Sequence, residues 1–157
     1  MKKSWVEKLR DSKGLPKVET IKDKGMERWG GKIGEKFVVP APVEVDAIMK
    51  KVPRGKVITG VELRSALAKK HKAALCCPLT SGIFTWISAY AAEEEKKTGK
   101  IDTTPWWRTV KTGGELNGKY PGGAENQKKL LAKEGIKVAS KGKKLMISDL
   151  EKHLIKI

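Results

Sequence analysis

The chain has 157 residues, with 34 Lys or Arg and 18 Asp or Glu, so its formal net charge is +16 at pH 7. A balance this basic predicts a polyanionic partner, above all nucleic acid. Lysine that serves only solubility is the alternative. No run of about 18 apolar residues is present, so we expect no membrane span. No apolar stretch follows the basic start as in a signal peptide, and the length favours one domain.

Two adjacent cysteines, Cys76 and Cys77, are the only ones in the chain. Neighbouring cysteines rarely bridge each other because the geometry is strained, so a reducing cytoplasm is the expected location. His71 adds a third potential zinc ligand, but no fourth stands at a usual spacing. We therefore expect no metal and no cofactor. Lys72 and the start of a helix lie close by in sequence, which could lower the pKa of a thiol and make it reactive.

The first 40 residues form the predicted N-terminal extension, and residues 41–157 form the predicted main domain. A short helix over residues 4–10 is expected, because Ser4 and Glu7 have the spacing of a capping box. Residues 11–40 are rich in Gly and Lys. We interpret them as a loosely structured arm that packs through a few apolar anchors, with a short helix around residues 26–29.

Three helices follow, near residues 43–52, from Thr59 to about His71, and from Thr80 or Ser81 to about Lys97. Thr59 and Glu62 form a second capping-box pattern. Apolar residues recur every three or four positions along the third helix and predict its core face; they are Ile83, Phe84, Ile87, Tyr90 and Ala91. Small residues occupy the opposite face and are predicted to point outward: Thr85, Ser88, Ala89 and Ala92. Two helices joined by a tight connection are typical of a helix-turn-helix.

The remaining elements are a helix over residues 124–133 ended by Gly135, a hairpin over 136–147 with a basic tip, and a short helix starting at Ser148. A helix-turn-helix followed by a hairpin predicts an α+β fold: a mostly helical winged helix-turn-helix domain with a short C-terminal β-hairpin wing.

Pro105-Trp106-Trp107-Arg108 precedes a glycine-broken run over residues 113–123. Consecutive side chains cannot both point into one core, so at least one tryptophan is expected to line a surface or a cleft. The alternative is a loop anchored on the core by its tryptophans.

Four motifs in order carry a family resemblance. They are Val-Pro-Arg-Gly-Lys-Val at residues 52–57, Pro-Trp-Trp-Arg-Thr-Val at 105–110, Leu-Asn-Gly-Lys-Tyr-Pro-Gly-Gly at 116–123 and Lys-Leu-Leu-Ala-Lys-Glu-Gly at 129–135. With these motifs, residues 41–147 resemble the DNA-binding domain of the O6-alkylguanine-DNA alkyltransferases. The first 40 residues do not resemble that family's N-terminal domain.

The departures from the family pattern remove its chemistry. The resemblance places the family's acceptor cysteine on Trp106 and its activating histidine on Trp107. An indole is no substitute nucleophile at neutral pH, so we expect no alkyl transfer and no enzyme. Glu134 matches the glutamate that orients the histidine; it is expected to have lost that partner and to make a local hydrogen bond at a helix end.

Two residues with which the family handles a flipped nucleotide are also replaced. Its stack-filling arginine falls on Gly82 and its phosphate-pushing tyrosine on Gly60. A tryptophan at the acceptor position also occurs in the alkyltransferase-like proteins, a non-enzymatic branch that binds alkylated DNA and generally keeps that arginine and tyrosine. The chain therefore resembles a divergent alkyltransferase-like protein, to which base flipping is not simply carried over.

The predicted function is a non-enzymatic, monomeric nucleic-acid-binding protein of DNA repair, which senses alkylated or extruded bases and prefers DNA to RNA as partner. Its predicted pocket, which would stack a base, consists of Trp106, Trp107, Tyr120, Pro121 and Gly122. Its predicted nucleic-acid contacts are Ser81, Gly82, Thr85, Arg108, Lys111, Lys119, Lys128, Lys129, Lys141, Lys143 and Lys144. Binding through lysines to phosphates should weaken steeply with salt. The alternatives are an alkyl-acceptor enzyme that uses Cys76 or Cys77, and a protein-interaction module of a repair pathway that docks through the N-terminal arm.

Overall fold

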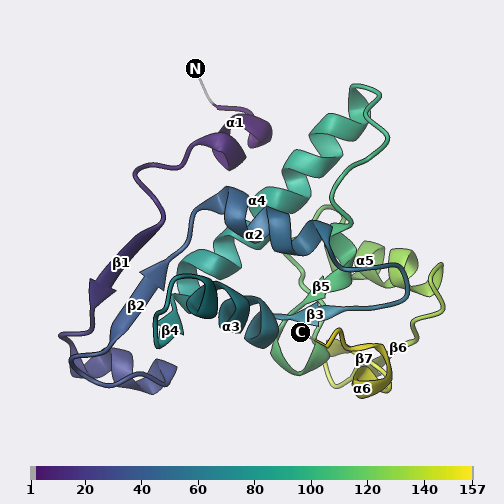
Figure 1. Ribbon diagram of the computed structural model, residues 1–157. Coiled ribbons are helices and arrows are strands. Elements are labelled where there is room, and N and C mark those ends of the chain that lie inside the picture. Colours follow the sequence, from purple (N-terminus) through teal and green to yellow (C-terminus); the bar gives the residue numbers. More distant parts are fainter. Residues whose placement is uncertain (1–2, 157) are drawn as a thin grey trace.

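The structure is a computed structural model that describes residues 3–156 (Figure 1). Its longer helices are α1 (Trp5–Arg10), α2 (Pro42–Lys50), α3 (Gly60–Lys70), α4 (Pro78–Lys97), α5 (Gly123–Ala132) and α6 (Leu150–His153). Short 3-10 helices are η1 (Lys24–Trp29), η2 (Trp106–Arg108) and η3 (Thr112–Gly114). The strands are β1 (Lys17–Thr20), β2 (Lys36–Val39), β3 (Ile58–Thr59), β4 (Leu75–Cys76), β5 (Thr109–Val110), β6 (Val138–Lys141) and β7 (Lys144–Ile147). The fold is thus α+β, as expected.

The strands of the described residues form three small sheets. In the first, β1 pairs antiparallel with β2, and β2 pairs parallel with β4. In the second, β3 pairs parallel with β5, which places Ile58 opposite Thr109. In the third, β6 and β7 form the predicted hairpin, closed at Lys141 and Lys144. Figure 1 shows β1 and β2 on one side of helices α2–α4, and α5 with the hairpin on the other.

The interpretation of residues 11–40 as a loosely structured arm is wrong. The segment contributes β1, η1 and β2, and Val38 of β2 is fully buried in the main core. The amide of Cys77 donates to the carbonyl oxygen of Val38 at 2.9 Å, continuing the parallel pairing of β2 with β4. The expected short helix is η1. The arm is structured because its partner strand lies almost 40 residues further along the chain, which no local pattern reveals.

The capping boxes predicted at Ser4 and Thr59 are present, but the last helix does not start at Ser148 as predicted: α6 begins at Leu150, with Asp149 as its N-cap residue and no side-chain cap. Ser4 Oγ accepts from the amide of Glu7, and the amide of Ser4 donates to the Glu7 carboxylate, so α1 begins where predicted. Thr59 and Glu62 make the same reciprocal pair at the start of α3. These caps satisfy amides that have no partner within the helix.

Helix α4 begins earlier than predicted and presents its faces in the opposite sense. It starts at Pro78, with Cys77 as the N-cap residue, because a proline in the first turn needs no amide partner. The small-residue face predicted to point outward is buried: Thr85, Ser88, Ala89 and Ala92 are at most 6% exposed. Of the residues assigned to the core face, Ile83 is 42% exposed and Ala91 alone is fully buried.

The reversal has two physical causes. Small side chains let α4 approach its neighbours closely and leave room beneath it for two aromatic rings, those of Trp106 and Tyr120. The apolar face is covered instead by α1, whose Trp5 stacks on Tyr90 with ring centroids 4.7 Å apart and contacts Trp86 edge-on at 5.9 Å. A short helix elsewhere in the chain therefore covers part of the stripe that sequence periodicity assigned to the core, and leaves Phe84, Ile87 and Tyr90 half-buried.

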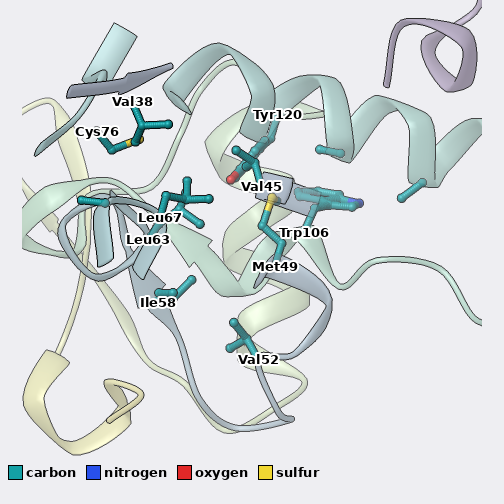
Figure 2. Packing of buried hydrophobic residues seen from close by; sticks show 13 residues of the cluster. Val38, Val45, Met49, Val52, Ile58, Leu63, Leu67, Cys76, Trp106 and Tyr120 are labelled. Carbon is teal, nitrogen blue, oxygen red and sulfur yellow. The ribbon is translucent and has the colours of Figure 1, made fainter. Parts of the chain in front are cut away.

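Two hydrophobic clusters result. The main one gathers residues of α2, α3 and α4, and Figure 2 shows Trp106 and Tyr120 beside Val45 and Met49 of α2. The second packs the hairpin against α5, through residues that include Val110, Leu131 and Ile147. Trp107 contacts both clusters. Within residues 3–156, no helix combines the length and apolarity that crossing a membrane requires.

Candidate nucleic-acid interface

The stretch from Thr104 to Gly123 carries the predicted site. It forms η2, β5 and η3 in turn and then leads into α5. Gly122, with a φ of 79°, is the left-handed N-cap residue of that helix. The two tryptophans of η2 point in different directions, with ring planes at 83°. Trp106 is 1% exposed and Trp107 is half-buried. One ring enters the core and the other lies at the surface, so both expectations for this pair hold in part.

Trp106 fills the space below α4. Its ring centroid is 5.1 Å from that of Tyr120, and its Nε1 donates to Glu93 at 3.1 Å. The Tyr120 hydroxyl donates to the carbonyl oxygen of Thr109 at 3.0 Å, and burial raises the pKa of this phenol. The prediction that Trp106 and Tyr120 line a base-stacking pocket is not met in this structure, because their rings lie inside the core. Of the other predicted pocket residues, Gly122 is exposed, and Trp107 and Pro121 are half-buried.

Glu134 is the electrostatic centre of the site. Its carboxylate accepts hydrogen bonds from Trp107 Nε1 at 2.6 Å, Arg108 Nε at 3.0 Å and the amide of Gly55 at 2.8 Å. The side chain is only 2% exposed. Burial opposes ionisation, but the Gly55 amide, the Trp107 indole and the Arg108 guanidinium outweigh it and hold the pKa of Glu134 below its usual range.

The prediction that Glu134 has lost its partner is therefore wrong. The indole N–H of Trp107 donates a hydrogen bond to this carboxylate, at the position where the family resemblance places the activating histidine. The carboxylate joins three separate segments: the turn after α2, η2 and the end of α5. The pairing was missed because tryptophan was treated as an apolar replacement for histidine, although its Nε1 is a hydrogen-bond donor.

Arg108 also serves this cluster. Its Nη1 donates to the carbonyl oxygen of Val52 at 2.8 Å, in addition to the ion pair with Glu134, and its side chain is 14% exposed. The guanidinium also lies 5.6 Å from the centre of the Trp107 ring. The prediction that Arg108 contacts a phosphate does not fit this arrangement, because its charge is already neutralised in a half-buried ion pair.

Two of the three contacts predicted on α4 point into the protein. Ser81 is 1% exposed and its hydroxyl donates to the carbonyl oxygen of Pro78, while Thr85 is 6% exposed and donates to that of Gly82. Gly82 is exposed, and a Cβ atom there would meet no other atom within 4 Å. The surface at this end of α4 is formed instead by apolar side chains, with Leu79 64% and Ile83 42% exposed.

The predicted lysine contacts keep their side chains at the surface. The exposed ones are Lys111, Lys119, Lys129, Lys141, Lys143 and Lys144, and Lys128 is half-buried. Glu115 lies 3.9 Å from Lys111 and 3.8 Å from Lys144, so it offsets part of their charge. For the other five, no acidic oxygen of residues 3–156 lies within 4.0 Å. Their charges are available to an external anion.

Arg64 is a cation that the sequence reasoning missed. A Cβ atom at Gly60 would lie 2.7 Å from Arg64 Nη1 and 3.7 Å from Thr112 Oγ1, so the guanidinium covers the start of α3 beside η3. Arg64 stands four residues after Gly60, on the same face of the helix. That spacing is the signal that could have identified it.

The cysteines are buried, with Cys76 4% and Cys77 8% exposed. Burial raises the pKa of the Cys76 thiol to about 12, and the neighbouring Cys77 adds to the effect. A thiol of this kind is not a nucleophile at neutral pH. Within the described residues, no group of three or more His, Cys, Asp or Glu side chains could hold a metal ion.

No protein-family model matches the sequence, and no curated protein matches it. The solved structures that match the fold include S. pombe Atl1 in complex with damaged DNA containing O6-carboxymethylguanine, and S. pombe ATL in complex with DNA. Each is 19% identical, has a TM-score of 0.51, and is matched over 74% of this chain and 94% of its own. The resemblance expected from the sequence motifs is thereby supported at the level of structure: the chain has the fold of the alkyltransferase-like protein Atl1.

Proposed function

We propose that this chain is a DNA-binding protein of the alkyltransferase-like kind that does not transfer alkyl groups. One observation carries the proposal: the fold is that of Atl1, whose solved structures contain DNA, on a chain with a net charge of +16. Neutralising phosphates with lysine releases counterions, which drives association at moderate salt.

The binding surface that we propose is built from lysines rather than from base-reading side chains. In this interpretation α3 and α4 form the helix-turn-helix, and β6 and β7 form the wing. The wing tip presents Lys141 and Lys143, and Lys119 and Lys129 extend the positive surface toward α5. The exposed residues at the start of α4 supply few hydrogen-bond donors for base edges, so sequence readout is weak.

The proposal includes the absence of alkyl-transfer chemistry. Trp106 stands at the acceptor position, is buried, and has its only side-chain N–H engaged by Glu93. Of the two cysteines considered as alternative nucleophiles, Cys76 has its pKa raised by burial and Cys77 is also buried. We also propose that the protein is a monomer, acts in the cytoplasm in DNA repair, and has residues 1–40 as an extension of its main domain.

Sensing of an alkylated or extruded base is the finer part of the proposal. Its support is the half-exposed Trp107 ring, on a segment held to α5 by the hydrogen bond that Gln127 Nε2 donates to the carbonyl oxygen of Trp107 at 3.0 Å. A base stacked there would remain at the surface, because Trp106 and Tyr120 occupy the interior.

The test is binding to duplex, single-stranded and O6-methylguanine-containing oligonucleotides over a series of salt concentrations. We expect binding that weakens steeply with salt, and a slope reduced by about 2 for Lys141→Gln/Lys143→Gln, since each lost phosphate contact removes roughly 0.9. Lys22→Gln/Lys24→Gln, which removes equal charge from another exposed segment, is the control. Failure to bind any DNA or RNA at any salt would contradict the proposal and favour a protein-interaction module.

Trp107→Ala tests the sensing part separately. If the ring stacks a base, this variant binds the alkylated and single-stranded oligonucleotides less tightly and keeps its affinity for plain duplex. A variant whose affinity changes by the same factor for all three oligonucleotides, or for none of them, would contradict sensing while leaving DNA binding intact.

A further inference from the structure

A hollow of about 500 Å³ lies between the N-terminal segment and the helices α2 and α4, away from the tryptophans of η2. Its floor is apolar and is formed by Leu15, by Pro42 at the start of α2, and by Phe84 and Ile87 of α4. Phe84 and Ile87 are three residues apart, so they share a helix face. The volume falls in the range of small-molecule sites, which are typically apolar with a few polar groups at the edge.

The rim of the hollow is cationic. It is formed by Lys3, Lys8, Lys13 and Asp11, which gives it a net charge of +2. The Asp11 carboxylate pairs with Lys3 and accepts from the amide of Lys13 at 3.2 Å; the hydrogen bond from Lys3 lowers the pKa of Asp11. No carboxylate of residues 3–156 lies within 4.0 Å of the ammonium groups of Lys8 and Lys13. Two positive charges at the rim therefore remain uncompensated.

The wall formed by α1 is fixed before any ligand binds. Glu94 of α4 accepts from the amides of Trp5 at 2.9 Å and Val6 at 3.0 Å, which satisfies two amides at the start of α1. The Trp5 ring stacks on Tyr90, and the Lys8 ammonium lies 4.3 Å from the centre of the Trp5 ring. Because neighbouring elements already hold this wall in place, a ligand loses less free energy to ordering it on binding.

From this arrangement we propose that the hollow binds a small aromatic anion. Its ring rests on Phe84 and Ile87, and its carboxylate, sulfonate or phosphate lies between Lys8 and Lys13. An apolar floor alone would accept a neutral ligand equally well, but two unpaired ammonium groups at the edge favour a negative one. The site uses neither the wing nor η2; the element it shares with the proposed DNA-binding surface is α4, through Phe84 and Ile87.

The probe is 8-anilinonaphthalene-1-sulfonate, whose fluorescence rises in an apolar environment. We expect saturable binding with one molecule per chain, and amide chemical-shift changes in labelled protein that cluster at residues 3–15 and 84–87. Lys8→Gln/Lys13→Asn should weaken binding about tenfold, because charge-assisted hydrogen bonds to the sulfonate are lost. Ile87→Ser should also weaken it by reducing the apolar floor.

Lys96→Gln/Lys137→Asn removes the same charge from exposed positions elsewhere and should leave the affinity unchanged. Thermal unfolding of each variant separates a lost contact from a lost fold. Three competitors distinguish the source of the anion: 2-naphthoate, an acetylated Asp-Phe-Glu peptide and a single-stranded oligonucleotide. Displacement by 2-naphthoate supports the proposal. Displacement by the peptide or the oligonucleotide alone, equal loss in the control variant, or shifts spread over the whole chain would overturn it.

Discussion

Replacing Glu134 by Gln should destabilise the protein strongly although the two side chains have the same shape. All three groups that contact the carboxylate are donors: the Trp107 indole, the Arg108 guanidinium and the Gly55 amide. In glutamine an amide NH2 group replaces one of the two carboxylate oxygens. One acceptor is lost, and the new N–H donor faces groups that are themselves donors. Arg108, with a side chain 14% exposed, would then hold an uncompensated charge.

The expected loss is about 3 kcal/mol of unfolding free energy, at the lower end of the roughly 3–5 kcal/mol that breaking a buried ion pair costs. With a urea m value of about 2 kcal/mol/M, the unfolding midpoint falls by about 1.5 M. Equilibrium urea denaturation at pH 7, followed by tryptophan fluorescence, measures it. Glu151→Gln, at an exposed position of α6, is the control and should change little.

The same variant carries a pH signature. The folded-state pKa of Glu134 is lowered, so its ionised form contributes stability above the unfolded-state pKa of about 4.3 and loses that contribution as the pH falls through the folded value. The gap between wild type and Glu134→Gln should therefore be largest near neutral pH and narrow below about pH 4. A loss under about 1 kcal/mol at pH 7, or a gap that stays constant down to pH 3, would refute the role assigned to this carboxylate.

Three other outcomes follow from burial and hydrogen bonding. Trp106→Ala should lower the unfolding free energy by about 3–5 kcal/mol, against little change for Leu79→Ala on the surface, as measured by urea denaturation. Glu94→Ala should speed hydrogen exchange at the amide of Trp5 without changing exchange in the main core; slow exchange there would show that α1 does not depend on this contact. Cys76 should resist iodoacetamide at pH 8 in the folded protein and react in urea, with intact mass as the readout, because burial raises its pKa to about 12. Rapid labelling of the folded chain would instead support the alternative of a reactive, nucleophilic cysteine.

Local signals were sufficient for some helix boundaries, although α4 and α6 begin at other residues than predicted. The capping boxes at Ser4 and Thr59 and the left-handed glycine at residue 135 act within a few residues, so the sequence alone predicts them. The hairpin predicted over residues 136–147 is confirmed as β6 and β7, since its strands are adjacent in the chain. Local patterns could not predict which other element packs against each face of a helix or strand.

The faces of α4 illustrate that limit. Periodicity identified an apolar stripe and a small-residue stripe correctly, but assigned the core to the wrong one, because α1 covers the first and Trp106 packs beneath the second. The site shows the same limit. Motif order located Trp107 and Glu134 in the chain, yet their hydrogen bond depended on an indole donor and on a fold that brings the two residues together.

The pairing of β2 with β4 constrains the order in which the protein can form. As the chain emerges from a ribosome, β1 and β2 are complete once residue 39 is made, but Val38 has no core to enter until α2, α3 and β4 follow. The Val38 side chain therefore stays exposed until about 40 further residues have been made. N-terminal segments are made first, yet Val38 of β2 can be buried only after β4 has been made, so on the ribosome β2 should dock after α2 and α3 have formed.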